Sequence, residues 1–148
     1  MSKRYLKSQS GFTLIEVMVV MVILATIAVF VVPKFMDEPK RAQRVKAQVT
    51  ISRFETALKT YYLDNGMYPT TDQGLEALVA EPNIDPIPAK WRKGGYIEKG
   101  KVPKDPWGND YIYLSPGLHG EFDIISYGQD RVEGGEDWDA DIESWNLE

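Results

Sequence analysis

The chain has 148 residues and no cysteine, which excludes a disulfide framework, a thiolate metal site and a cysteine nucleophile. Its formal charge of −5 is uneven, because residues 1–11 contribute +3 and the remainder therefore carries −8. An acidic body argues against nucleic acid as a partner, and the length leaves room for one small core beyond an N-terminal apolar segment.

Residues 1–11 are basic and polar, and an apolar run follows from Phe12 to Val32. A helix of that length spans roughly 30 Å, the thickness of a bilayer core. An ordinary secretory signal peptide has a shorter apolar region followed by a small-x-small cleavage site, and neither feature is present here. We therefore expect the apolar helix to stay on the protein as a single-pass membrane anchor.

Basic residues lie on both sides of this segment. Lys3, Arg4 and Lys7 favour a cytoplasmic N-terminus, which would place the rest of the chain across the membrane. The cations between Lys34 and Lys46 weigh against that orientation. Charge alone therefore leaves the orientation open.

Gly11, Phe12 and Glu16 stand together where the basic leader meets the apolar segment. This pattern resembles the N-terminal motif of type IV prepilins and pseudopilins. The resemblance implies that a prepilin peptidase cuts after Gly11 on the cytoplasmic face and that the new N-terminal residue, Phe12, is N-methylated. The expected parts are a leader peptide (1–11), a transmembrane and assembly helix (12–32) and a periplasmic domain (33–148).

Glu16 is a carboxylate within a membrane segment, which costs about 2.5–3.5 kcal/mol at the bilayer centre and less near its edge. Cleavage creates a partner, since the α-amino group of Phe12 is largely protonated near neutral pH. We expect Glu16 of one subunit to pair with Phe12 of its neighbour and so to set the axial step of a filament. The alternative is a glutamate that reaches back to the interface.

Two prolines follow the apolar run. Pro33 has no N–H group and would clash with the carbonyl of Val29 in a continuous helix, so we expect a kink or local break there. Pro39 is a second break signal, because proline favours the first turn of a new helix.

From Lys40 to about Asn65 the apolar residues recur at spacings of three and four, which predicts an amphipathic helix with one buried face. They are Val45, Val49, Ile51, Phe54, Leu58, Tyr61 and Tyr62. Gly66 is the expected C-cap, and Thr70 with Gln73 forms a capping box that opens a short helix through Leu75, Leu78 and Val79.

The prolines and glycines of residues 81–110 predict irregular loops, and residues 111–114 and 121–126 predict a hairpin in which Phe122 and Ile124 point inward. The stretches 61–75 and 105–109 resemble the major pseudopilin in particular. The expected fold is α+β and pilin-like, with a long N-terminal helix packed on a small antiparallel sheet and a calcium-binding C-terminal loop.

Eight acidic residues and one arginine lie between Asp130 and Glu148. A glycine-rich acidic turn supplies the carboxylates and carbonyls that Ca²⁺ prefers. Residues 126–142 also resemble the calcium loop of major pseudopilins, and that resemblance implies side-chain ligands at Asp130, Asp141 and, with less support, Asp139. It further implies the carbonyls of Tyr127 and Val132. The alternative is a solvated acidic tail.

No catalytic residue is expected. His119 is the only histidine, it lies in a predicted turn, and the chain has no phosphate loop, nucleophile elbow or dinucleotide fingerprint. The enzyme alternative is a membrane-tethered hydrolase that uses paired carboxylates.

The resemblance extends from Gly11 to Trp145. It implies a structural subunit of the type II secretion pseudopilus, a homopolymer in the periplasm that drives export of folded proteins across the outer membrane. Expected partners are minor pseudopilins, the prepilin peptidase and the inner-membrane secretion platform. The alternatives are a type IV pilus major pilin, which usually carries a C-terminal disulfide loop, and a calcium-binding membrane-anchored protein that never polymerises.

Overall fold

The computed structural model describes residues 11–147 and divides the chain into two compact units, Met1–Pro39 and Lys40–Glu148. One long helix, α1 (Leu14–Asn65), contributes to both units. All the buried apolar side chains of the described residues lie between Ala47 and Ile142, so the core belongs to the second unit alone.

The first unit contains the apolar part of α1. Residues Leu14–Val31 have a mean hydropathy of 2.9 and none of them is buried against other parts of the protein. Thr26, a polar residue in this stretch, donates its hydroxyl to the carbonyl of Ile23 at 2.7 Å. A long apolar surface without a protein partner matches the expected membrane anchor.

The described helix backbone continues through Pro33 and Pro39, so the local break that was one of the two outcomes expected at these prolines is absent, and the kink stays a prediction. A proline inside a helix removes one backbone hydrogen bond, and the remaining bonds on either side can sustain the helical backbone.

The second half of α1 carries the buried stripe. Ala47, Ile51, Phe54, Leu58 and Tyr61 follow one another at alternating steps of four and three residues, and each is at most 1% exposed. The sequence analysis placed Val45, Val49 and Tyr62 on this face, which is wrong: their exposed fractions are 48%, 46% and 42%. These three lie outside the stripe that packs on the core.

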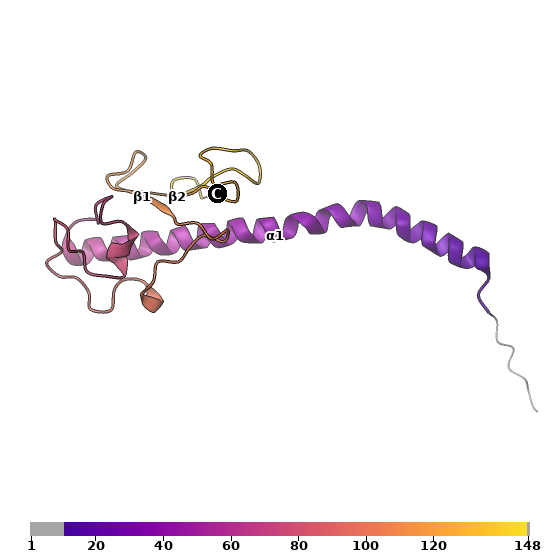
Figure 1. Ribbon diagram of the computed structural model, residues 1–148, viewed down its shortest axis with the longest axis horizontal. Coiled ribbons are helices and arrows are strands. Elements are labelled where there is room, and N and C mark those ends of the chain that lie inside the picture. Colours follow the sequence, from indigo (N-terminus) through magenta and orange to yellow (C-terminus); the bar gives the residue numbers. More distant parts are fainter. Residues whose placement is uncertain (1–10, 148) are drawn as a thin grey trace, which may run out of the picture. The chain divides into compact units, whose positions relative to one another are not determined.

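A three-stranded antiparallel sheet covers the buried stripe, as Figure 1 shows for β1 and β2 beside the C-terminal half of α1. The strands are β1 (Ile112–Leu114), β2 (Asp123–Ser126) and β3 (Ile142–Glu143), in the order β1-β2-β3. Tyr113 pairs with Ile124, and Ser126 pairs with Ile142. These residues share one face of the sheet, and all four are buried.

The predicted hairpin is confirmed, with Ile124 fully buried. Phe122 is half-buried, and its ring packs edge-on against Tyr68 at 5.0 Å. Sequence analysis missed β3, because a two-residue strand inside an acidic, glycine-rich segment has no periodicity to detect.

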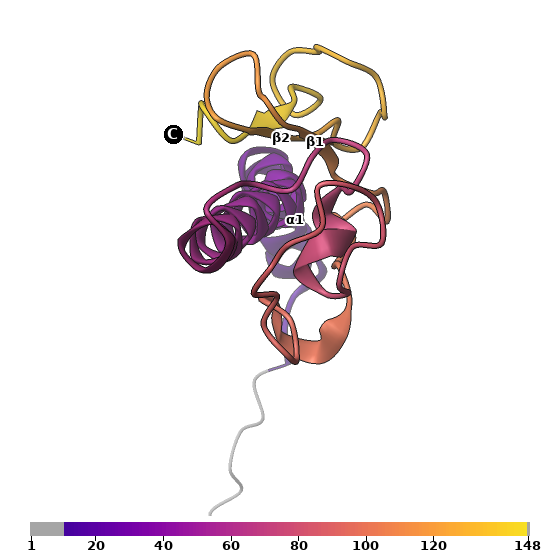
Figure 2. The same cartoon turned by 90° about the vertical axis from the view of Figure 1, so that its left-hand side faces the viewer.

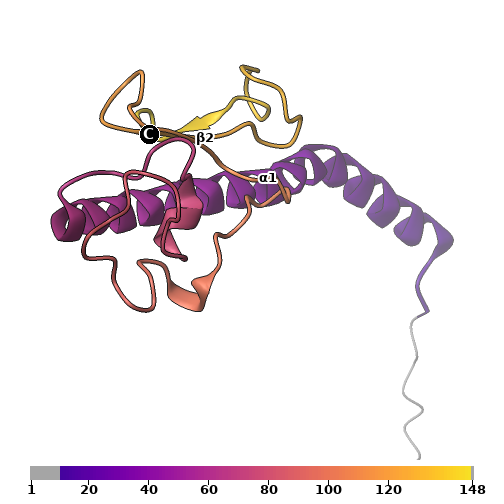
Figure 3. The ribbon, with the colours of Figure 1, turned by 60° about the vertical axis from the view of Figure 1, so that its left-hand side comes forward.

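The chain between α1 and β1 is mostly irregular, as predicted. It contains two short 3₁₀ helices, η1 (Leu75–Leu78) and η2 (Glu98–Gly100). The capping box forms before η1: the Thr70 N–H donates to Gln73 Oε1 at 3.1 Å, and the Gln73 N–H donates to Thr70 Oγ1 at 3.2 Å. In Figures 2 and 3 the segment around η2 lies below α1, whereas the acidic, glycine-rich segment between β2 and β3 lies above it.

Candidate functional site

The N-terminal motif precedes the helix in an open stretch of backbone. Gly11–Thr13 are not helical, and a methyl group added to Gly11 would meet no atom within 4 Å. The side chain of Phe12 is exposed at 84%. The backbone on both sides of the Gly11–Phe12 bond is therefore free of packing within the subunit.

Glu16 lies in the first turn of α1 and forms a capping box with Thr13. The Glu16 N–H donates to Thr13 Oγ1 at 3.3 Å, and the Thr13 N–H lies 3.5 Å from Glu16 Oε2. The negative charge of the carboxylate also stabilises this end of the helix, because the helix dipole is positive at its N-terminus. Glu16 thus has a role within its own chain that the sequence analysis did not foresee.

The acidic loop, residues 127–141 between β2 and β3, is fixed to α1 by one cation. Arg44 donates from Nη1 to the carbonyls of Ala140 and Trp138. Within the loop, the Asp141 N–H donates to the Gly134 carbonyl at 3.1 Å, and the Gly134 N–H donates to Asp141 Oδ2 at 2.8 Å. These contacts place Asp141 at the base of the loop.

Asp141 has one carboxylate oxygen that is buried without a donor. Its Oδ1 atom is buried and has no hydrogen-bond partner among the described residues. Burial raises the pKa of this carboxyl group, opposed by the Gly134 N–H, while Asp130 and Glu133 raise it further. A buried acceptor without a donor, close to two other carboxylates, is a position at which a cation would be favourable.

The structure brings some of the expected calcium ligands together. The Asp130 carboxylate lies close enough to Asp141 to raise the pKa of Asp141, and Asp141 in turn adds to the rise in the pKa of the Tyr127 phenol, after partial burial and Glu133. The Val132 N–H donates to Asp130 Oδ1 at 3.3 Å, whereas the side chain of Asp139 is exposed. Among residues 11–147 no group of three or more carboxylates or histidines is poised for a metal ion. Of the expected side-chain ligands, Asp130 and Asp141 are therefore the pair that the structure brings near one another.

Asp105 organises a polar network that the sequence analysis missed. Its Oδ1 accepts the N–H groups of Trp107 at 3.0 Å and Asn109 at 2.7 Å, and its Oδ2 accepts the Asn109 side-chain amide and the Ser126 hydroxyl. Asp105 is 5% exposed. The signal was in the sequence: an aspartate two residues before a free N–H group is typical of an Asx turn, and Pro106 favours such a turn.

A second buried carboxylate, Asp123, fixes the hairpin turn. It accepts the backbone N–H groups of Leu118 at 2.7 Å and His119 at 3.1 Å, and it lies 3.2 Å from His119 Nδ1. The His119 ring stacks on Trp145 with a centroid distance of 3.8 Å. His119 therefore joins the turn to the C-terminal segment, which is a structural role.

A membrane-type apolar helix, a helix-capping glutamate at its start and a small domain built on its second half define the class of membrane-anchored, pilin-like proteins. The family model "Type II secretion system (T2SS), protein G" matches residues 34–145, and the "Prokaryotic N-terminal methylation motif" matches residues 6–32. The chain belongs to the type II secretion system protein G family.

Known relatives agree with this assignment along almost the whole chain. The type II secretion system core protein G of Vibrio cholerae serotype O1 is 53% identical over 143 residues, covering 97% of this chain and 96% of the relative. That of Pseudomonas aeruginosa is 52% identical over 140 residues, covering 95% and 97%. The crystal structure of the major pseudopilin from the type 2 secretion system of enterohaemorrhagic Escherichia coli is 43% identical with a TM-score of 0.67, over 78% of this chain and 96% of that one. The family and the α+β, pilin-like architecture with a long N-terminal helix and a small antiparallel sheet are confirmed, and calcium binding by the C-terminal loop stays a prediction.

Proposed function

We propose that this protein is the major structural subunit of a type II secretion pseudopilus, anchored in the bacterial inner membrane with residues 33–148 in the periplasm. The subunits polymerise into a fibre that drives folded proteins across the outer membrane. The observation that carries the proposal is the apolar helix segment Leu14–Val31, which is not buried in the single subunit and carries Glu16 in its first turn. Such a surface needs lipid before assembly and neighbouring helices afterwards.

Processing by a prepilin peptidase after Gly11 and N-methylation of Phe12 prepare the subunit. The open backbone at Gly11 supports access of a peptidase. Inside the fibre, Glu16 pairs with the α-amino group of a neighbouring Phe12. The pair neutralises both charges in a low-dielectric surrounding, where an unpaired charge is costly.

Calcium orders the C-terminal loop in this proposal. Asp130 and Asp141 hold the ion with the carbonyls of Tyr127 and Val132, and Asp139 is a further candidate ligand. The ion supplies positive charge among mutually repelling carboxylates and thereby stabilises the folded loop. The protein itself performs no catalysis, and its partners are copies of itself, minor pseudopilins, the prepilin peptidase and the inner-membrane platform.

Two substitutions of Glu16 test the assembly step and separate charge pairing from helix capping. Glu16→Ala removes both the charge and the capping group, whereas Glu16→Gln keeps a side chain that can cap but has no charge. We expect both variants to be inserted and cleaved and neither to yield fibres sheared from the cell surface, as seen by electron microscopy. Fibres from Glu16→Gln cells would assign Glu16 to capping only. A wild-type protein that forms no fibres would identify a calcium-binding anchor instead.

A further inference from the structure

A groove runs along the exposed side of α1, between residues 45–60 and the loop that contains η2. Its volume is about 1070 Å³. Val45 and Val49, the two valines that the core leaves uncovered, line it together with Ile97 and Leu147. The groove therefore offers apolar surface on a part of the domain that its own core does not use.

The charge of the groove is strongly positive. Six cations line it with one carboxylate, that of Glu98; the cations are Lys46, Arg53, Arg92, Lys99, Lys101 and Lys104. Arg92 pairs with Asp64 and Lys104 pairs with Asp110. The other four have no carboxylate within 4.0 Å among the described residues. A body with an acidic excess thus carries a basic groove, and a segment with clustered carboxylates would complement its charge.

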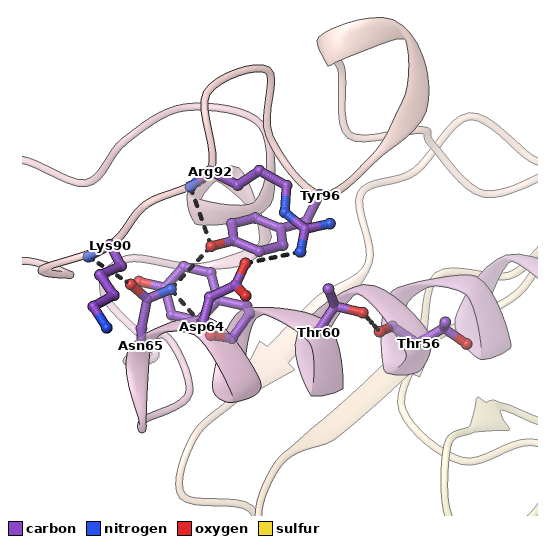
Figure 4. A network of polar contacts seen from close by, with 8 residues as sticks. Thr56, Thr60, Asp64, Asn65, Lys90, Arg92 and Tyr96 are labelled. Carbon is purple, nitrogen blue, oxygen red and sulfur yellow. Dashed lines mark hydrogen bonds and ion pairs between the residues drawn. The ribbon is translucent and has the colours of Figure 1, made fainter.

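The groove wall is held in place by the end of α1, as Figure 4 shows. The Asn65 side chain donates to the Tyr96 hydroxyl at 3.0 Å and accepts the Lys90 N–H at 3.1 Å, and the Arg92 N–H donates to the same hydroxyl at 3.2 Å. Arg92 also forms its ion pair with Asp64 at 3.0 Å. The loop that carries Lys99 and Lys101 is therefore anchored on the helix at its base.

The same chain carries a segment of opposite charge on another surface. The tip of the acidic loop, residues 133–139, contains four exposed acidic residues and no basic one; they are Glu133, Glu136, Asp137 and Asp139. The contact of Arg44 with Ala140 fixes the end of this tip on α1. The tip lies above α1 and the segment around η2 lies below it (Figures 2 and 3), and none of residues 133–139 lines the groove of its own subunit.

We propose that the basic groove of one subunit receives the acidic tip, residues 133–139, of a second copy of this chain. The inference rests on the proposed polymerisation and names the two surfaces that meet. The surfaces differ, so the contact is heterologous: it does not close on itself, and repetition builds an open helical fibre. Glu136 and Asp137 meet Lys99 and Lys101, while the valines of the groove lose their exposure to water.

Cysteine cross-linking tests the contact directly, because the chain has no cysteine of its own. The full-length double variant Lys101→Cys with Glu136→Cys should give a ladder of disulfide-linked dimers, trimers and longer species in the oxidising periplasm. Each single variant should lack the ladder. A matched control, Lys90→Cys with Glu136→Cys, uses an exposed lysine that does not line the groove and should also lack it.

Wild-type fibres are scored in the same cells by electron microscopy, which separates this inference from the proposed function. If the wild type forms fibres but the variant Lys101→Cys with Glu136→Cys gives no ladder, the inference is overturned and the proposed function stands. The groove would then bind another anion. No fibres in the wild type would overturn both.

Charge exchange provides a second test in case the cysteines impair assembly. Lys99→Glu with Lys101→Glu should reduce sheared fibres at least tenfold, because like charges would then face one another. Adding Glu136→Lys and Asp137→Lys on the same chain should restore them. Failure of the fourfold variant to recover, when it folds with the wild-type melting temperature, contradicts the proposed pairing.

Discussion

Asp105→Ala is a substitution from which the structure predicts a large loss of stability at a single polar residue. Asp105 accepts two backbone N–H groups, one side-chain amide and one hydroxyl, and it is 5% exposed. Alanine leaves these donors without an acceptor. A hydrogen bond to a charged group contributes about 1.5–3 kcal/mol, and an unsatisfied buried donor costs about 1–3 kcal/mol.

Some of the freed donors will find water, so we expect a net loss of about 3–5 kcal/mol in the free energy of unfolding. For a domain of roughly 110 residues that corresponds to a fall in Tm of about 12–20 °C. The assay is thermal and urea unfolding of residues 40–148, followed by circular dichroism. This fragment contains the whole buried core.

Two companion variants make the result interpretable. Asp105→Asn keeps one acceptor oxygen but places an N–H donor opposite the side-chain N–H donor of Asn109. Its free energy of unfolding should therefore lie between those of the wild type and Asp105→Ala. Asp110→Ala removes an exposed carboxylate that pairs with Lys104 at 3.3 Å, and it should cost less than about 0.5 kcal/mol. Equal losses for Asp105→Ala and Asp110→Ala would refute the argument that the buried network holds this loop.

Three further predictions concern processing, calcium and alkaline pH. Replacing Gly11 by leucine should leave the full-length precursor in the membrane, visible as a larger band on a gel; mature protein beginning at Phe12 would contradict it. Millimolar Ca²⁺ should raise the Tm of residues 40–148 relative to chelator, and Asp130→Ala should abolish most of that rise; equal melting of the wild type in both conditions would leave the loop a solvated acidic surface. Burial raises the pKa of the Tyr113 phenol to about 12, whereas in the unfolded chain the phenol ionises near pH 10. The burial of the neutral phenol therefore stabilises the fold fully below pH 10, and this stabilisation is lost as the pH rises toward 12. Tyr113→Phe should therefore lose less stability than wild type between pH 9 and pH 11 in urea unfolding, and parallel losses would contradict the assignment.

Much of the molecule could be predicted from local signals in the sequence. The apolar run after Phe12 predicts a membrane helix, because the length and hydropathy of a segment and the charges that flank it decide whether it inserts into a membrane. The motif around Gly11 and Glu16 predicts its processing. The Gly66 cap has the positive φ of 74° that its position requires, and the Thr70 capping box has its expected hydrogen bonds. These features depend on neighbours within four residues.

Other features required tertiary structure. Val45 and Val49 match the helical period as well as Ile51 does, yet the sheet covers only one side of α1 and leaves both valines in the groove. Periodicity shows that a helix has an apolar face, but only the packed sheet selects which apolar residues are buried.

The buried carboxylates depend on still longer connections. Asp105 accepts a hydrogen bond from the hydroxyl of Ser126, which lies 21 residues further along the chain. The loop that carries Asp141 is held by Arg44, which donates to the carbonyl of Ala140, 96 residues away in the sequence. The sequence alone determined the anchor, the helix, the hairpin and the family. The tertiary structure decided which side chains are buried, which carboxylates are satisfied and where opposite charges gather, because each depends on residues that meet only in the folded chain.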